Sequence, residues 1–313
     1  MSIEKSQCWQ APHDAVERPV SQAEMTVLLD ASSLIDLQRR IPLSFADLDS
    51  IFRKGRARLV LTRTSVLEFS APAAETGDFP SLQRELRQIE RLPVAYLREG
   101  GITNSELKEA VEALAEGREF IRPDPYVERW DETVVVEGPS PARMLVNQRL
   151  DDLIFMLWRQ RALSPVHRRW GTILRQQFKQ DRDLPARVRK AAGKNFRQAL
   201  RRHLAMFSIS YPEEKVGELA DWIYEMPTRC PGHRLAYDVR QELMNNLTED
   251  VTENDILDIA HVEAVPYVDA ITMDRNTAAL CRSVAKRLEK KHPGLRYAKR
   301  IFTSLEALLK ANF

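Results

Sequence analysis

Met25-Thr-Val-Leu-Leu-Asp30 and Tyr267-Val-Asp-Ala-Ile-Thr-Met-Asp274 are two short apolar runs, and each of them ends in an acidic residue. Runs of this length and composition are typical of buried strands in a parallel sheet. Arg58-Leu-Val-Leu-Thr62 is a third such run, and helical patterns follow at Ser32–Arg39 and at Thr64–Phe69. Strand and helix alternating at this spacing predict right-handed α/β units.

The pattern of apolar residues divides the chain into three parts. Residues 1–24 lack the apolar centre of a signal peptide and are interpreted as a flexible N-terminal tail. Residues 25–75 and 250–313 carry the α/β pattern, whereas residues 76–249 have mainly helical periodicity. We therefore predict an α/β fold in which a parallel sheet flanked by helices is interrupted by a mainly helical, basic insertion.

Prolines and periodicity set the expected limits of several elements. Pro72 is expected to bound the helix that begins at Thr64, because proline lacks a backbone N–H. Helical periodicity extends over Ala142–Leu163 and over Pro185–Phe207, with Pro185 near the first turn. Glu132–Glu137 is interpreted as a strand in an otherwise irregular stretch.

Composition narrows the class of protein. With 313 residues, of which 43% are hydrophobic, the chain can bury a sizeable core. No run of about 18 uncharged apolar residues is present, so we expect no membrane span. The three cysteines are odd in number and far apart, which argues against a disulfide framework and favours a reducing cytoplasm.

Four acids occupy comparable places in the predicted fold. Asp30 and Asp274 lie at the carboxyl ends of predicted parallel strands, and Glu68 and Asp255 lie near the amino-terminal ends of helices. Ligands of open α/β sheets bind beyond the carboxyl ends of the strands, so we expect these acids to converge there. Carboxylates crowded together repel, and a hard divalent cation such as Mg²⁺ or Mn²⁺ offsets that repulsion. A cation held in this way can activate water against a phosphodiester.

A structural interpretation of the same acids stays open. Asp30 could cap the helix that follows it, and Asp255 fits a capping box that begins at Thr252. Glu68 and Asp274 could be solvated acids in loops.

In the order of their motifs, these residues resemble the PIN domains. The family begins with a strand ending in Asp, followed by a small hydroxyl residue and Leu or Val, as in Leu28–Ile35. Its second strand leads to a helix bearing a Glu, as in Leu59–Glu68. The third element is an Asp that opens a helix, as in Asp255–Ala260, and the fourth is a strand closing with Thr-x-Asp, as in Ile271–Asp274. The resemblance covers only the two ends of the chain, and the insertion is far longer than in small PIN toxins.

The resemblance implies a PIN-like nuclease domain that cleaves RNA, usually single-stranded, with Mg²⁺ or Mn²⁺. It implies that Asp30 and Asp274 bind the metal directly, and that Glu68 and Asp255 complete or orient the metal shell. Asp258 lies one helical turn beyond Asp255 and is expected as a further ligand or as its replacement.

The resemblance also implies supporting roles. The hydroxyls of Ser32 and Thr272 are expected to hold carboxylates or waters by hydrogen bonds. Asp269, near the start of the apolar run Tyr267–Asp274, is interpreted as structural or solvated.

A basic block lies in the predicted insertion. From Arg159 to Arg202 there are fourteen Lys or Arg against two acids, a net charge of +12. The whole chain carries +2, so the other residues sum to −10, and this asymmetry favours a polyanionic partner. The candidate phosphate-binding residues are Arg168, Arg169, Arg175, Arg187, Arg189, Lys190, Lys194, Arg197, Arg201 and Arg202.

Other interpretations of the basic block remain. The charges could form a solvated face, or pair with the acidic remainder of the chain or with a protein partner. Trp158, Trp170 and Phe178 are interleaved with the cations and could stack on bases, although aromatic residues at helical spacing are more often core.

The function expected from the sequence is therefore a cytoplasmic, toxin-like, metal-dependent endoribonuclease. One alternative is a catalytically silent PIN-fold scaffold that binds nucleic acid or protein, and another is a structure-specific DNA nuclease. RNA is favoured over DNA as the partner. A protein regulator or inhibitor, and homo-oligomerisation, remain open.

Overall fold

A computed structural model describes the chain over residues 25–40, 43–97, 101–127, 132–136, 142–146, 176, 178–246, 258–259 and 261–311. The expected N-terminal tail, residues 1–24, lies outside these residues.

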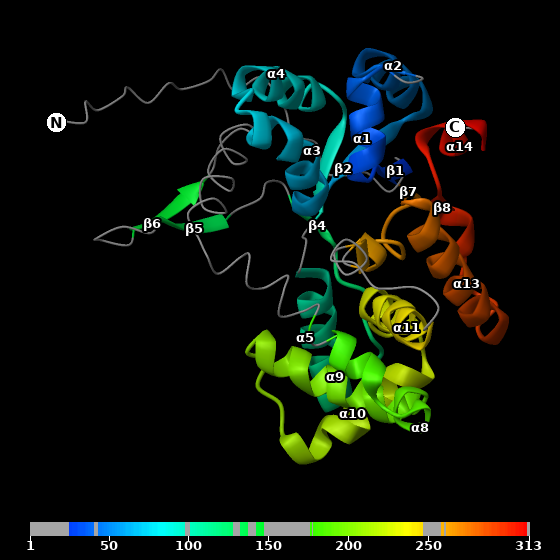
Figure 1. The fold of residues 1–313 in the computed structure, drawn as a ribbon. Helices are drawn as coiled ribbons and strands as arrows, with labels where there is room; N and C mark the ends of the chain where they lie inside the picture. The colour runs from blue at the N-terminus through cyan, green and yellow to red at the C-terminus, as the bar shows by residue number, and fades with distance from the viewer. Residues whose placement is uncertain are drawn as a thin grey trace.

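The centre of the fold is a sheet of five parallel strands with one short antiparallel strand at its edge (Figure 1). The strands are β1 (Met25–Leu28), β2 (Ala57–Leu61), β3 (Val94–Leu97), β4 (Tyr126–Val127), β7 (Ala270–Thr272) and β8 (Ile301–Phe302). The parallel strands lie in the order β3-β2-β1-β7-β8, and β4 pairs antiparallel with β3. The predicted α/β fold with a parallel sheet is thereby confirmed.

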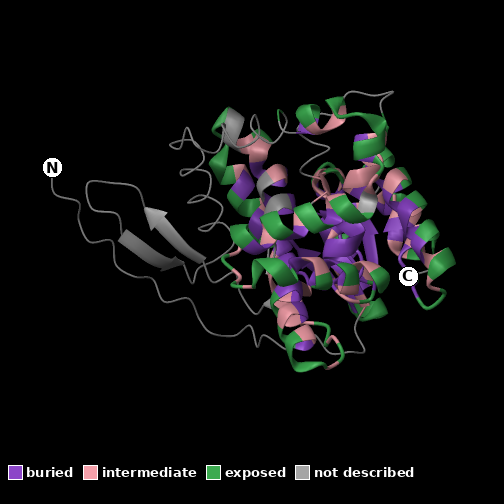
Figure 2. Ribbon diagram, turned by 90° about the horizontal axis from the view of Figure 1, so that it is seen from below, coloured by how far each residue is buried: buried purple, intermediate pink, exposed green. Residues whose placement is uncertain are grey.

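Helices cover both faces of the sheet, because the strand side chains alternate between two apolar clusters. Val27 and Leu29 of the first run face one cluster, and Leu28 faces the other. Buried strands surrounded by helices with exposed outer faces are visible in Figure 2. The first face is covered by α1 (Ala31–Gln38), α2 (Phe45–Gly55), α3 (Arg63–Thr76), α4 (Phe79–Ile89) and α14 (Leu305–Lys310).

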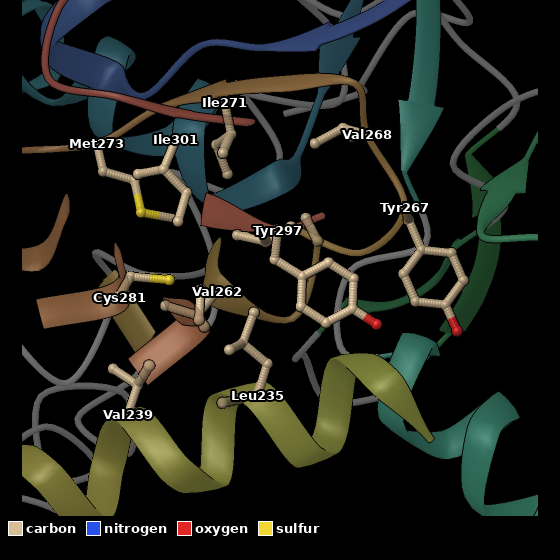
Figure 3. Packing of buried hydrophobic residues seen from close by; sticks show 14 of the residues in the cluster. Leu235, Val239, Val262, Tyr267, Val268, Ile271, Met273, Cys281, Tyr297 and Ile301 are labelled. Atoms are coloured by element: carbon tan, nitrogen blue, oxygen red, sulfur yellow. The ribbon is translucent and has the colours of Figure 1, made fainter. Parts of the chain in front are cut away.

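The second face packs against α13 (Arg275–Lys291) and α11 (Pro231–Asn245). Leu235 and Val239 project from α11 toward Tyr297 and Cys281, with Ile271 of β7 on the far side of the cluster (Figure 3). These side chains are fully or almost fully buried, so the hydrophobic effect holds α11 against the sheet.

The middle of the chain forms a helical region, seen below the sheet in Figure 1. Its helices are α5 (Gly101–Glu116), α8 (Ala186–Arg189), α9 (Ala192–Met206), α10 (Val216–Glu225) and α11. Phe196 and Leu200 of α9 and Leu219 of α10 are completely buried in a third apolar cluster. The long helical middle region expected from periodicity is therefore present.

Two strands of this sheet, β3 and β4, come from residues 76–249, which were expected to form the helical insertion. β3 pairs in parallel with β2, with Leu59 opposite Val94. Helical periodicity was expected over residues 76–249, and a short apolar run fits either a strand or a helix. The α/β part of the chain thus extends beyond residue 75.

The expectation that Pro72 bounds a helix is wrong. Pro72 lies inside α3, exposed to solvent, and the helix ends at Gly77, whose φ of 76° is left-handed. A proline on the solvent side removes one backbone hydrogen bond without preventing the helix from continuing. Glycine adopts the left-handed conformation at no steric cost, so it ends the helix instead.

Two further helix predictions need correction. Residues Ala142–Val146 form strand β6, which pairs antiparallel with β5 (Glu132–Val136); a short apolar run fits either element, and the cross-strand pairing decides. Pro185–Phe207 is divided between α8 and α9. Asn195 stabilises this break, because its side-chain amide donates hydrogen bonds to the carbonyls of Val188 and Arg189 at the end of α8.

Within the described part of the chain, no helix combines the length and the apolar character that crossing a membrane requires.

A buried carboxylate joins the helical region to the sheet. Glu106 of α5 is completely buried and accepts hydrogen bonds from the backbone N–H groups of Gly232 and His233, both at 2.8 Å. It also accepts one from the Tyr267 hydroxyl at 2.6 Å, shortly before β7. A Cβ atom on residue 232 would lie 2.6 Å from the carbonyl oxygen of Glu263, so glycine is required there.

Glu106 should make stability depend on pH. Burial raises its pKa from 4.5 to about 7, and the hydrogen bonds from Tyr267, His233 and Gly232 offset only part of this effect. Between these pH values the folded chain retains a proton that the unfolded chain has released, so the free energy of unfolding falls as pH rises. The fall expected from this group is about 3 kcal/mol.

Urea denaturation at pH 5 and pH 7 measures most of this change. In Glu106→Gln the same rise in pH should lower stability by clearly less than in the wild type, whatever the variant's absolute stability. An identical pH dependence in the two proteins would contradict the assignment.

Candidate functional site

The direction of the chain connections reverses between β1 and β7, which are neighbours in the sheet. From β1 the chain proceeds to β2 and β3 on one side, whereas β7 is followed by β8 on the other side. Ligands of open α/β sheets bind beyond the carboxyl ends of the strands at such a switch point. Asp30 lies two residues beyond β1, and Asp274 lies two residues beyond β7. Both acids therefore follow the carboxyl ends of neighbouring parallel strands.

Asp30 is the N-cap of α1. Its Oδ1 atom accepts a hydrogen bond from the backbone N–H of Ser33 at 3.1 Å, and its Oδ2 atom accepts one from the Ser32 hydroxyl at 2.6 Å. The amino-terminal end of α1 carries partial positive charge, which stabilises the carboxylate. Asp30 thus has the capping role considered from the sequence, and Ser32 orients its carboxylate.

Thr272 connects the end of β7 to Asp30. Its side chain is completely buried, and its hydroxyl donates a hydrogen bond to Oδ1 of Asp30 at 2.8 Å. The same hydroxyl accepts hydrogen bonds from the Asp30 backbone N–H at 2.9 Å and from the Ser33 hydroxyl at 3.0 Å. Three hydrogen bonds therefore converge on one buried oxygen atom and fix the position of Asp30 relative to β7.

Asp274 is the N-cap of α13. Its Oδ1 atom accepts hydrogen bonds from the backbone N–H groups of Asn276 at 2.8 Å and Thr277 at 3.1 Å. The residue is exposed, and within the described residues its Oδ2 atom accepts no hydrogen bond. One oxygen atom of Asp274 is therefore engaged by the helix, and the other remains available to a ligand.

Asp258 is linked to the beginning of the same helix. The Thr277 hydroxyl donates a hydrogen bond to Oδ2 of Asp258 at 3.3 Å, while the backbone N–H of Thr277 binds Asp274. Thr277 therefore contacts two of the predicted acids, one through its backbone and one through its side chain.

The remaining acids occupy different positions. Glu68 is half-buried on α3, which follows β2 and packs against α1. Asp255 lies outside the described residues. Asp269 lies before β7, at the opposite end of that strand from Asp274, and accepts hydrogen bonds from the backbone N–H and hydroxyl of Thr26. This arrangement agrees with its interpretation as a structural residue.

The oxygen atoms of this site can be compared with the ligands that the expected metal ion prefers. Carboxylate and hydroxyl oxygens, the groups present here, are the ligands that Mg²⁺ and Mn²⁺ prefer. However, no three acidic, histidine or cysteine side chains of the described residues are grouped as a metal site. The available oxygens fit the metal chemically, and a complete ligand set would require further residues, of which Asp255 is the expected one.

The structure describes seven of the ten predicted phosphate-binding residues; Arg168, Arg169 and Arg175 lie outside its described ranges, as do Trp158 and Trp170. Phe178 is 2% exposed and packs against Met244, in agreement with a core role. Four cations are exposed on the helical region: Arg187, Lys190, Lys194 and Arg202.

The other three predicted cations already have partners within the chain. Arg189 is buried, and its guanidinium donates hydrogen bonds to the carbonyls of Leu184 and Met244. The two remaining ones form exposed ion pairs, Arg197 with Asp221 at 3.0 Å and Arg201 with Glu213 at 2.5 Å. Pairing of the basic block with the acidic remainder, one of the interpretations left open, thus occurs at these two residues.

Ser33 and Thr277 are not among the site residues predicted from the sequence. Each lies three residues after a capping acid and donates its backbone N–H to that acid. Each also extends its hydroxyl to a second predicted residue, Ser33 to Thr272 and Thr277 to Asp258. A Ser or Thr at the third helical position after Asp30 and after Asp274 was the signal that could have identified them.

Comparisons with protein-family models, with curated proteins and with solved structures find no match to this chain.

Replacement of Thr272 tests how far its hydroxyl holds the site together. Thr272→Val keeps the side-chain shape but leaves the N–H of Asp30 and the hydroxyl of Ser33 without a buried acceptor. The free energy of unfolding should fall by about 1–3 kcal/mol. Urea denaturation measures the change, and Thr272→Ser, which keeps the hydroxyl, should lose clearly less. Wild-type stability of Thr272→Val would show that these hydrogen bonds contribute little.

Proposed function

We propose that the chain is a Mg²⁺- or Mn²⁺-dependent endoribonuclease that hydrolyses phosphodiester bonds of single-stranded RNA. The observation that supports this proposal is the placement of Asp30 and Asp274 beyond neighbouring parallel strands at the switch point of the sheet. The hydrogen bond from Thr272 to Asp30 draws these two ends of the chain together. The resemblance of the four acidic motifs to PIN domains supplies the reaction class.

Hydrogen bonds at the helix N-termini already orient the carboxylates of Asp30 and Asp274 for binding a cation. Asp30 and Asp274 would bind it, and Glu68, Asp258 and Asp255 would complete or orient its shell. A bound Mg²⁺ or Mn²⁺ supplies an activated water and neutralises charge on the phosphodiester. Within the chain, Thr272 keeps Asp30 in place, while the helix N-termini offset the negative charge that gathers at this edge.

The exposed cations of the helical region would bind the RNA backbone. Arg187, Lys190 and Lys194 are exposed, and no acid of the described residues lies in an ion pair with them. Arg197 and Arg201 would exchange their exposed acidic partners for phosphates, which costs little because exposed ion pairs contribute at most about 1 kcal/mol. Binding through such contacts weakens strongly as salt concentration rises.

A catalytically silent scaffold is the main competing function. Capping of α1 and α13 already accounts for Asp30 and Asp274 without any metal. Turnover of single-stranded RNA that requires Mn²⁺ and stops on addition of EDTA separates the nuclease from the scaffold. The same assay with single-stranded and flap DNA separates it from a DNA nuclease. The cytoplasmic location and the toxin-like role expected from the sequence are part of the proposed endoribonuclease function.

Asparagine variants separate catalysis from capping. Asn caps helices about as well as Asp, so Asp30→Asn and Asp274→Asn should fold normally while losing a charged metal ligand. Mn²⁺-dependent cleavage of a labelled single-stranded RNA should fall by roughly a hundredfold or more.

Asp78→Asn is the matched control, because Asp78 caps α4, a helix that follows another helix and no strand. Its activity should equal that of the wild type. Full activity of Asp30→Asn would rule out the proposed metal site, whereas equal losses in all three variants would indicate a general effect on folding.

A further inference from the structure

A second candidate site lies in the helical region. A pocket of about 200 Å³ opens between α8, α9 and α11. Asp181 and Leu184 line it from before α8, and Ile259 and Glu263 line it from the segment that follows Asp258. The proposed nuclease chemistry uses none of these residues.

The arginines of α9 and α11 differ in their partners, whereas Arg189, which also lines the pocket, donates its hydrogen bonds to carbonyl groups. α9 and α11 together contain five arginines, and three of them form ion pairs with acids: Arg197 with Asp221, Arg201 with Glu213, and Arg234 with Asp238. The other two, Arg202 and Arg240, line the pocket. Neither guanidinium donates a hydrogen bond to any of the residues that the structure describes.

These two pocket arginines concentrate positive charge. Burial lowers the pKa of Arg240; Asp181 opposes this shift, and the positive charge of Arg202 adds to it. The Arg240 guanidinium lies over the ring of Phe178, with its central carbon 5.5 Å from the ring centroid. Arg240 is thus held in place by an aromatic ring while its hydrogen-bond donors have no protein acceptor among the described residues.

Two histidines, His203 and His233, also lie in the pocket wall. The His203 and His233 rings meet edge to face, with centroids 4.9 Å apart. Among the residues that the structure describes, Nδ1 of His203 and Nε2 of His233 are buried without a hydrogen-bond partner, and His233 is only 2% exposed. Buried polar atoms normally find a partner, because leaving one unsatisfied costs about 1–3 kcal/mol.

A bound anion would change the electrostatic environment of His203. Burial lowers the pKa of His203 to about 4, and Arg240 and Arg202 contribute further to this shift. Burial also lowers the pKa of His233. An anion between Arg202 and Arg240 would offset the contribution of these two arginines to the pKa of His203. Asp181 and Glu263 are the acids of the lining, and the Asp181 carboxylate can accept hydrogen bonds from ligand hydroxyls.

We infer that this pocket binds a small phosphomonoester. Two guanidinium groups whose donors find no acceptor in the described part of the chain match a phosphate, which accepts several hydrogen bonds at once. The carboxylate of Asp181 suits hydroxyl groups on the remainder of the ligand, and Val188 and Met244 supply apolar wall. The volume suits a compound about the size of a sugar phosphate.

Isothermal titration calorimetry with ribose 5-phosphate, inorganic phosphate and unphosphorylated ribose tests this inference on the full chain. Ribose 5-phosphate should bind, inorganic phosphate should compete with it, and ribose alone should give no signal. Arg202→Gln, an exposed position, should weaken binding roughly tenfold or more, and so should Arg240→Gln.

The neighbouring residue provides the control. Arg201→Gln removes the same charge one position away, from a side chain paired with Glu213, and should bind ribose 5-phosphate as tightly as the wild type. Equal weakening in Arg201→Gln and Arg202→Gln, or no binding by the wild type, would overturn the proposed pocket. Asp30→Asn should bind normally, so a negative nuclease assay leaves this result unchanged.

Discussion

The hydrogen bonds between Asp30 and Thr272 are the constraint on which the rest of the structure depends. β7 is only three residues long, and its partner β1 lies more than 240 residues earlier in the chain. Side chains hold β7 against β1 at both ends, through Asp269 and Thr26 where the strand begins and through Thr272 and Asp30 where it finishes. These contacts fix the register of the sheet at the point where two distant parts of the sequence meet.

Asp30 and Asp274, the acids beyond the carboxyl ends of β1 and β7, have two roles. Asp30 and Asp274 each satisfy backbone N–H groups of a helix, so their carboxylates have a fixed orientation before any ligand arrives. In the proposed nuclease this preorganisation is useful, because a metal site works best when its ligands are already positioned. The buried Glu106 acts in a comparable way between the helical region and the chain before β7, with its own hydrogen bonds to helix N–H groups.

The sequence was most informative where an apolar run ended in an acid. The runs up to Asp30 and Asp274 predicted β1 and β7, and the rule for parallel sheets predicted that their ends lie at one edge. Other runs were not predicted correctly: β3 lies in a stretch that was interpreted as mainly helical, and β6 was assigned to a helix. Ion pairs such as Arg201 with Glu213 depend on how helices pack, which periodicity does not reveal. Asp255 lies outside the described residues, so its position stays a prediction.

The strand order has a consequence for synthesis of the protein on the ribosome. β1 lies in the middle of the finished sheet, but the residues that cover one of its edges come from near the end of the chain. While the chain is still growing, β3, β2 and β1 can pair, and β1 then presents an open edge of unpaired N–H and C=O groups. Throughout translation of the whole helical region this edge would be able to pair with other nascent chains. Synthesis of β7 closes the edge and at the same moment completes the hydrogen bonding of Asp30.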